Sequence, residues 1–369
     1  MKHIRTLLAT TALFAATTAT LCSQSAEVIA NVPGPVFITY QHSRYHVVGS
    51  SYFYNRNWWN HDYWAIDVNS RPSQVTNFLS DNVQRFGNLP SYQFGGNDGY
   101  FVTTPTKNLP SGFQQDWIYA VYVDRSDRNN PTTHIAQFNP DGTQATPNWY
   151  TFANPSYNIR LAFDEVGTFG YNLLSAQYTT NQLTLRKHDT SGAATDIGTY
   201  NDLRVSSLLV VPNDQVRYGS LAGQLLATST GASEDFITID SNGALQNWGR
   251  VGRNIATLSI AVGNVIYLAD WPSNTIIELR APVLDNYRGE IIGFIYDNRA
   301  PGSGIAHIYW DQATQSVKWD MILYFRDYGL DPKGATAVVV PEPSSLLALL
   351  MLSGMSARAF RRRARENGN

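Results

Sequence analysis

Short runs of β-branched and aromatic residues follow one another along most of the chain, separated by turn-forming residues. Between residues 34 and 335, runs rich in Val, Ile, Tyr, Phe and Thr alternate with clusters of Gly, Pro, Asn and Asp, as is typical of strands and tight turns. Helical periodicity is almost absent, and no helix-length amphipathic segment separates the runs to make βαβ units. The pattern therefore predicts an all-β chain, with strands at 36–40, 63–68, 117–123, 183–187, 208–211, 236–239, 265–269 and 305–310.

A turn with Asp or Asn three residues before Gly recurs in the middle of the chain. Its glycines, Gly142, Gly192 and Gly243, are 50 and then 51 residues apart, and each turn lies between two strand-like runs. Asp or Asn caps such a turn with its side chain, and Gly adopts the positive φ that a hairpin requires. The near-equal spacing indicates an internal structural repeat.

Upstream of two of these turns, a second shared pattern appears at 163–176 and at 213–227, with a weaker copy at 262–279. Each copy fits the order inner strand, turn, strand, loop, strand, Asp-x-x-Gly turn, outer strand, which is the four-stranded blade of a β-propeller. Over roughly residues 110–285 the pattern resembles NHL-repeat and gluconolactonase-like propellers.

The length between the ends predicts the number of blades. Residues 34–333 hold six repeats of 50, so a six-bladed β-propeller is expected, with five or seven blades and a pair of β-sandwiches as the alternatives. Blade 1 would contain 63–68 and an insertion near 80–110, and blades 2 to 4 would contain the three turns. Blade 5 is expected at 255–285 and blade 6 at 290–325, with the strand near 36–40 closing the ring on the last blade.

The first 25 residues have the features of a secretory signal peptide. Lys2, His3 and Arg5 precede an apolar stretch from Leu7 to Leu21, and Ser23 and Ser25 offer small residues before a cleavage site. Cleavage after Ser25 would remove Cys22, the single cysteine of the chain. An ordinary N-terminal helix and a lipoprotein signal are the alternatives.

The last 30 residues carry a different pattern of Pro-Glu-Pro, an apolar run and a basic end. The motif Val340, Pro341, Glu342, Pro343 precedes the run 346–357, which leads into a cluster of arginines: Arg358, Arg361, Arg362, Arg363 and Arg365. This order resembles the PEP-CTERM sorting signal of bacterial surface proteins. The resemblance implies an exosortase-type transpeptidase that recognises the motif, a C-terminal transmembrane helix, and a cytoplasmic arginine cluster in agreement with the positive-inside rule.

The predicted transmembrane helix is short. Its 12 residues span about 18 Å of helix, against a hydrocarbon core of about 30 Å. A buried amphipathic helix with a solvated basic tail is the alternative, although the run from Leu346 to Leu352 has no polar face. The expected organisation is therefore a signal peptide at 1–25, a secreted β-propeller at 26–335 and a sorting signal at 338–369.

The two ends also account for most of the basic charge. The chain of 369 residues has 27 basic and 29 acidic side chains, and the ends contain seven of the former and one of the latter, which leaves 26–343 with a net charge of −8. An acidic domain disfavours nucleic acid, and a single cysteine excludes a disulfide scaffold. The 46 aromatic residues are far more than a disordered chain carries.

Two constellations could carry chemistry in the middle of the chain. Gluconolactonase-like propellers bind a divalent metal in the central channel, and blade position makes six residues candidates here: Asp116, Asp164, Glu165, Asn213, Asp214 and Asp270. Most of them lie in turns of the repeat, where turn capping explains them without a metal. No cofactor is therefore assigned, and a cation such as Ca²⁺ has no sequence support.

The second constellation is the aromatic segment 52–64, in which Asn and Asp stand between aromatic residues. Exposed aromatic faces stack on sugar rings while amides and carboxylates bind hydroxyls, so Trp58, Trp59 and Trp64 are candidate ligand-binding residues. The alternative is that these rings fill the space between blades.

Taken together, these patterns favour an exosortase-sorted surface or extracellular-matrix protein whose propeller binds a partner such as exopolysaccharide. A metal-dependent secreted hydrolase or lyase and a purely structural matrix component are the alternatives. No catalytic residue is assigned.

Overall fold

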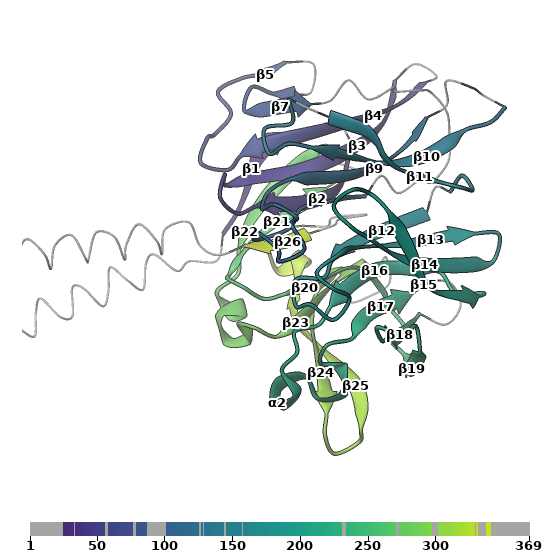
Figure 1. The fold of residues 1–369 in the computed structure, drawn as a ribbon. Helices are drawn as coiled ribbons and strands as arrows, with labels where there is room; N and C mark the ends of the chain where they lie inside the picture. Colours follow the sequence, from purple (N-terminus) through teal and green to yellow (C-terminus); the bar gives the residue numbers. More distant parts are fainter. Residues whose placement is uncertain are drawn as a thin grey trace, which may run out of the picture.

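Strands form nearly all the regular structure of the chain (Figure 1). The structure is a computed structural model, and it describes residues 25–340 apart from 33, 56–57, 77–78, 87–100, 125–126, 128, 144, 157, 231–233, 271–272, 297–301, 329 and 331–336. Within these residues, strands pair antiparallel into six four-stranded sheets whose first strands lie side by side around a common axis. The expected all-β, six-bladed propeller is confirmed, and the five-bladed, seven-bladed and sandwich alternatives are excluded.

Blades 1 to 4 follow one another along the chain, in the places that the repeat predicts. Blade 1 also carries a small hairpin, β5 (Val75–Thr76) and β6 (Leu79–Ser80), before its last strand. From the inside outward, the strands of blade 1 are β2 (Pro35–Gln41), β3 (His46–Asn55), β4 (Trp58–Asp67) and β7 (Val83–Phe86), and those of blade 2 are β8 (Val102–Thr103), β9 (Ile118–Asp124), β10 (Thr132–Phe138) and β11 (Ala145–Phe152). In the same order, the strands of blade 3 are β12 (Asn158–Phe163), β13 (Leu173–Thr179), β14 (Gln182–His188) and β15 (Ala194–Asn201), and those of blade 4 are β16 (Val205–Val210), β17 (Leu225–Ser229), β18 (Asp235–Ile239) and β19 (Leu245–Arg250).

Blades 5 and 6 are interleaved, and here the expected allotment is wrong. The inner strand of blade 5, β20 (Asn254–Ile260), is followed by the hairpin β21 (Val265–Asp270) and β22 (Thr275–Arg280), which belongs to blade 6. The chain then returns to complete blade 5 with β23 (Ile291–Tyr296), β24 (Gly304–Asp311) and β25 (Ser316–Tyr324). The sequence could not reveal this exchange because each hairpin has the same local pattern whichever blade receives it.

Blade 6 is completed by strands from both ends of the described chain. β26 (Ala337–Val340) pairs with β21 as the innermost strand, and β1 (Ser25–Asn31) pairs with β22 as the outermost strand. Figure 1 shows these two strands, purple and yellow, on the same green hairpin. Two expectations are thereby corrected. The strand near 36–40 opens blade 1 and does not close the ring, and the propeller extends past residue 335 to Val340, into the segment expected to be sorting signal.

Short helical turns connect some of the strands. They are α2 (Gln215–Tyr218) and η1 (Gly219–Leu221) between β16 and β17, η2 (Pro282–Tyr287) after β22, and η3 (Phe325–Tyr328) after β25. Asp214 begins α2, since its carboxylate accepts a hydrogen bond from the backbone N–H of Arg217.

The hydrophobic core is divided among the six interfaces between neighbouring blades. Each of the buried clusters combines residues from two adjacent blades. β21 shows how a strand serves two of them: Tyr267 packs toward blade 1, while Ile266 and Leu268 pack toward blade 5. Since successive side chains point to opposite faces of a sheet, a blade buried on both faces has runs of apolar residues rather than strict alternation.

The repeated Asp-x-x-Gly turns join the third and fourth strands of blades 2 to 4. In blade 3, the Asp189 carboxylate accepts from the backbone N–H groups of Ser191 at 2.8 Å and Ala193 at 3.1 Å, and Gly192 has a φ of +88°. A Cβ at Gly192 would overlap the carbonyl oxygen of Trp149 in the previous blade. The glycine is thus required both by the turn and by the contact between blades.

Gly192→Ala should destabilise the protein by about 3 kcal/mol, because alanine adds a clash to the cost of positive φ. Gly249→Ala is the matched control, since Gly249 has a φ of +96° and no neighbouring atom within 4 Å of its would-be Cβ. It should cost only about 1 kcal/mol. Urea unfolding of both variants measures the difference, and equal losses would contradict the packing argument.

His188 is a buried histidine beside the Asp189 turn. It is not exposed to solvent, its Nε2 lies 2.7 Å from the Ser175 hydroxyl, and its ring lies 4.4 Å from that of Tyr150. Burial, assisted by the charge of Arg186, lowers the pKa of His188 to about 4. The folded state therefore holds this imidazole neutral at pH values where the unfolded chain binds a proton.

Because the folded pKa is below the unfolded value of 6.5, the contribution of His188 to stability is unaffected above pH 6.5 and is lost as the pH falls toward 4. The loss should reach about 3 kcal/mol at pH 4 and should not grow below it. His188→Gln keeps a neutral hydrogen-bonding group but removes the titrating imidazole. The free energy of unfolding of the variant should therefore depend less steeply on pH between pH 6.5 and pH 4, by the uptake of one proton. Chemical unfolding at several pH values tests this, and identical slopes in parent and variant would refute it.

Candidate functional site

The ends of the strands define two faces of the propeller. The turn face carries the connections between first and second strands and the turns at Gly142, Gly192 and Gly243. The loop face carries the second-to-third connections, such as Thr180–Asn181, and the links from one blade to the next, such as Asp202. Neighbouring blades place equivalent connections side by side, so each face gathers residues that are about 50 positions apart in the chain.

The acidic candidates for a channel metal instead hold the backbone of turns. Asp164 is fully buried, and its carboxylate accepts from the N–H groups of Val166, Gly167, Phe169 and Tyr171 at 2.6 to 3.3 Å.

The other candidates likewise lie in turns and loops between strands, or at the end of a strand in the case of Asp270. Asp116 of blade 2 accepts from the N–H groups of His42 and Ser43 in blade 1, and Glu165 accepts from that of Thr106 at 2.6 Å. Asp270 accepts from the Ser273 hydroxyl, whereas Asn213 and Asp214 are exposed where α2 begins. In the part of the chain that the structure describes, no three His, Cys, Asp or Glu residues come together to hold a metal ion.

The aromatic candidates have different positions. Trp64 is only 1% exposed and packs in the cluster between blades 1 and 6, with its ring against Gly49. Its assignment as a ligand-binding residue is therefore wrong, because the ring fills the space between blades. Trp58 and Trp59 lie in β4, where their backbones pair with Asn55 and Tyr54, and their side chains lie outside the described structure.

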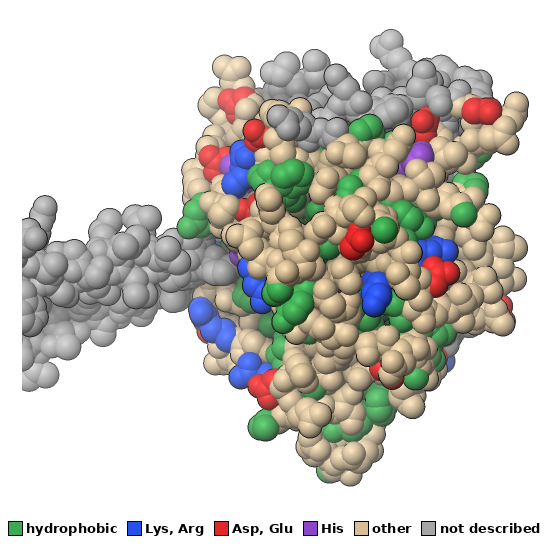
Figure 2. All heavy atoms as spheres, in the orientation of Figure 1, with side chains coloured by type: hydrophobic (Ala, Val, Ile, Leu, Met, Phe, Trp, Pro, Cys, Tyr) green, Lys and Arg blue, Asp and Glu red, His purple; other side chains and the backbone are tan. Residues whose placement is uncertain are grey.

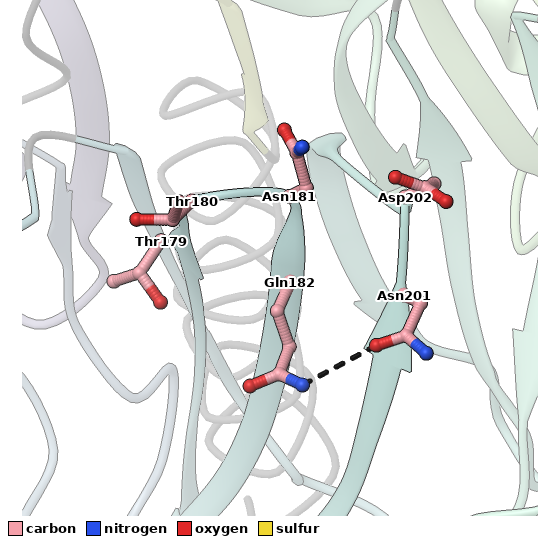
Figure 3. Close-up of a pocket in the computed structure, with 6 residues that line it drawn as sticks. All are labelled: Thr179, Thr180, Asn181, Gln182, Asn201 and Asp202. Atoms are coloured by element: carbon pink, nitrogen blue, oxygen red, sulfur yellow. Dashed lines mark hydrogen bonds between the residues drawn. The ribbon is translucent and has the colours of Figure 1, made fainter.

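A polar hollow opens on the loop face of blade 3. It has a volume of about 360 Å³ and is lined by Thr179, Thr180, Asn181, Gln182, Asn201 and Asp202. Figure 3 shows Gln182 pointing toward Asn201 across two neighbouring strands, and its amide donates to the Asn201 oxygen at 3.3 Å. Thr179, Gln182 and Asn201 stand in register on three successive strands, which brings their side chains together.

A second hollow adjoins the first and extends to blade 4. It has a volume of about 400 Å³ and shares Asn201 and Asp202 with the first; its further lining residues are Tyr200, Leu203, Ser229, Asp235, Ile237, Leu245 and Asn247. We call the two hollows together the polar groove. In its second part, the Asn247 amide donates to the Asp235 carboxylate at 2.9 Å. Burial, with the charge of Asp240, raises the pKa of Tyr200 to about 12, so its hydroxyl is neutral and donates to the Gly243 carbonyl at 2.9 Å.

Local backbone chemistry shapes the groove. Thr180, Asn181 and Asp202 have positive φ values of 32°, 69° and 55°, and the Asp202 N–H donates to the Asn181 carbonyl at 2.6 Å. Asn and Asp adopt this conformation more readily than other residues with a side chain. The sequence marks these positions as turns, but it contains no signal that the two turns meet, so sequence reasoning missed this site.

The groove is rich in amide, hydroxyl and carboxylate groups, with Leu203, Ile237 and Leu245 as its apolar part. Such a lining matches a ligand that has many hydroxyl groups and small apolar faces. On the face drawn in Figure 2, acidic and basic side chains are interspersed among a much larger area of backbone and uncharged side chains.

Comparison with known proteins identifies the C-terminal segment. Residues 339–363 match the PEP-CTERM protein-sorting motif. The chain carries a PEP-CTERM sorting motif. This confirms the resemblance seen in the sequence, and a PEP-CTERM motif implies export, a membrane-anchored sorting signal and processing by an exosortase.

The structure places the start of the PEP-CTERM motif and not the rest. Val340 ends β26 and pairs with Val265 at the turn face. Pro341, Glu342 and Pro343 lie outside the described residues, as do the predicted helix at 346–357 and the cluster of Arg358, Arg361, Arg362, Arg363 and Arg365. None of the helices among the described residues has the length and apolar character to cross a membrane.

Three solved structures are similar to the propeller. They are a functionally unknown protein from Desulfotomaculum acetoxidans DSM 771 (14% identity, covering 75% of this chain and 76% of that one, TM-score 0.35), an exo-inulinase from Aspergillus awamori (12%, 82% and 68%, TM-score 0.38) and a GH32 β-fructofuranosidase from Bombyx mori in complex with sucrose (9%, 83% and 66%, TM-score 0.34). With TM-scores below 0.5, these likenesses carry no argument about function. No curated protein matches the chain.

Proposed function

We propose that this protein is exported by an N-terminal signal peptide at 1–25, sorted by an exosortase, and displayed at the cell surface or in the extracellular matrix, where its propeller binds exopolysaccharide through the polar groove. The membrane helix of the sorting signal would anchor the chain before processing.

The observation that carries this proposal is the opposite placement of the groove and the exit of the chain. The groove lies on the loop face, whereas Val340 leaves the ring at the turn face and the sorting motif follows directly. A chain held at the membrane by its C-terminal segment therefore presents the loop face outward. This places the polar lining where a surface polysaccharide can reach it.

The chemistry of the groove supports a saccharide ligand. Gln182 and Asn201 supply amide donors and acceptors, Asp202 and Asp235 supply acceptors, and Leu203 supplies an apolar surface. Amides bind sugar hydroxyls both as donors and as acceptors, and carboxylates bind them as acceptors. The net charge of −8 of residues 26–343 disfavours anionic lipid surfaces and nucleic acid as competing partners.

Replacing Gln182 and Asn201 together by Ala should weaken glycan binding at least tenfold, because two exposed hydrogen-bonding amides are removed at about 1 kcal/mol each. The measurement is a neutral-glycan array, followed by titration of the full chain in detergent. Gln312→Ala, an exposed glutamine between β24 and β25 on the turn face, is the matched control and should bind as the parent does. If the double variant binds like the parent, the groove is not the site.

Replacing Pro341 and Pro343 together by Ala should block sorting. The variant should stay in the membrane fraction with its C-terminal tail intact, whereas the parent loses the tail, as shown by cell fractionation and intact-mass measurement. Pro72→Ala, in a loop of blade 1, controls for the loss of a proline elsewhere and should be processed normally. Equal processing of the double variant and the parent would show that the motif is not used.

A further inference from the structure

Arg160 reaches across the centre of the propeller and contacts residues of three other blades. Arg160 lies on β12, the inner strand of blade 3, and its Nε donates to the Ser206 carbonyl of blade 4 at 2.6 Å. Its guanidinium carbon lies 5.2 Å from the centre of the Phe37 ring in blade 1 and 5.9 Å from that of Phe101, which precedes β8 of blade 2. The positive charge is therefore held in place on the axis, stacked against aromatic rings.

This charge has no acidic partner among the described residues. Arg71, Arg186 and Arg288 each form an ion pair with a carboxylate within 3.2 Å, whereas the polar partners of Arg160 are the carbonyl oxygens of Ser206 and Ile159. Burial, with the repulsion from Arg204, lowers the pKa of Arg160 to about 10, so the guanidinium is still charged at neutral pH. A guanidinium that has no carboxylate partner among the described residues is costly in such surroundings, and an anion would offset that cost.

The guanidinium also has an unused donor. Nη2 donates to no described residue, and Arg160 as a whole is partly exposed. A guanidinium edge with free N–H groups matches the planar geometry of a carboxylate.

A second unsatisfied donor stands beside it. Asn158 precedes Arg160 by two residues on β12, so the two side chains leave the same face of the strand about 7 Å apart. The Asn158 Nδ2 is sealed from solvent and has no hydrogen-bond partner. Buried polar groups are nearly always satisfied, so an orphaned amide next to an unpaired cation indicates a missing acceptor.

The same end of blade 3 leads to the polar groove. Asn158 pairs across the sheet with Tyr178, whose hydroxyl donates to the Asn181 side chain of the groove at 3.3 Å. Asn158 is thus linked to the groove through Tyr178 at the loop-face end of blade 3.

We propose that Arg160, beside the unsatisfied amide of Asn158, binds the carboxylate of an acidic saccharide, so that the polysaccharide recognised by the propeller contains hexuronate units. This inference rests on the proposed saccharide-binding function. A monoanion is favoured over phosphate or sulfate polymers because one uncompensated positive charge is available and the surrounding domain is acidic.

The test is calorimetric titration of the full chain in detergent with sodium D-glucuronate, and with D-glucose as the neutral counterpart. Glucuronate should bind more tightly than glucose, and Arg160→Gln should weaken glucuronate binding at least tenfold while leaving glucose unchanged. Arg288→Gln, which removes an exposed arginine paired with Asp285 at 2.7 Å, should have no effect. Glucuronate binding that is absent in the parent, or unchanged in Arg160→Gln, would overturn the proposal, as would displacement by sulfate at an equal concentration.

A measurement on the unmodified protein covers the case in which Arg160→Gln does not fold. Phenylglyoxal modifies accessible arginines, and mass spectrometry reports the extent at each one. Glucuronate, and not glucose, should protect Arg160 while leaving Arg288 reactive; equal modification of Arg160 with and without glucuronate would refute the site. The variant with Gln182 and Asn201 replaced by Ala distinguishes saccharide binding by the polar groove from carboxylate binding by Arg160. If only the groove proposal is wrong, glucuronate should still protect Arg160.

Discussion

The hairpin of β21 and β22 holds both ends of the described chain, with β26 along its inner edge and β1 along its outer edge. Without β1 and β26, both edges of this hairpin would expose unpaired backbone groups, and the last blade of the ring would be incomplete. Because β1 and β26 are about 300 residues apart, closure orders nearly the whole chain at once. The two interfaces of blade 6 depend on this closure, because their buried clusters combine residues of blade 6 with those of blades 1 and 5.

Contacts on the turn face reinforce the same ring. Asp116 of blade 2 holds the first turn of blade 1, Glu165 of blade 3 holds the loop at Thr106 in blade 2, and Tyr218 of blade 4 donates to the Gly289 carbonyl of blade 5. Two of the candidate metal ligands, Asp116 and Glu165, thus hold the backbone of a neighbouring blade. On the loop face, where the polar groove lies, the carboxylates of Asp127 and Asp270 cap their own turns.

Closure by the C-terminal strand also links the fold to sorting. β26 ends at Val340, and the Pro-Glu-Pro motif begins with the next residue, so the distance between the ring and the sorting motif is minimal. Removal of the tail beyond the motif would leave every strand of the ring in place. The arrangement therefore suits a domain that is complete before processing and is presented with its turn face toward the membrane.

The sequence by itself determined the strands, the repeat turns and the sorting motif, because each of these depends on residues close together in the chain. They are runs of apolar residues, a capping Asp or Asn before Gly, and Pro-Glu-Pro followed by an apolar run and arginines. It also predicted six blades from the length of the repeat. Only the tertiary structure decided the exchange between blades 5 and 6, the burial of Trp64 and the meeting of Gln182 with Asn201. The position of Arg160 on the axis belongs to the same group, since an arginine on one strand has no local sign of which blades surround it. Pairing partners and burial depend on residues far away in the chain, and a local pattern contains no information about them.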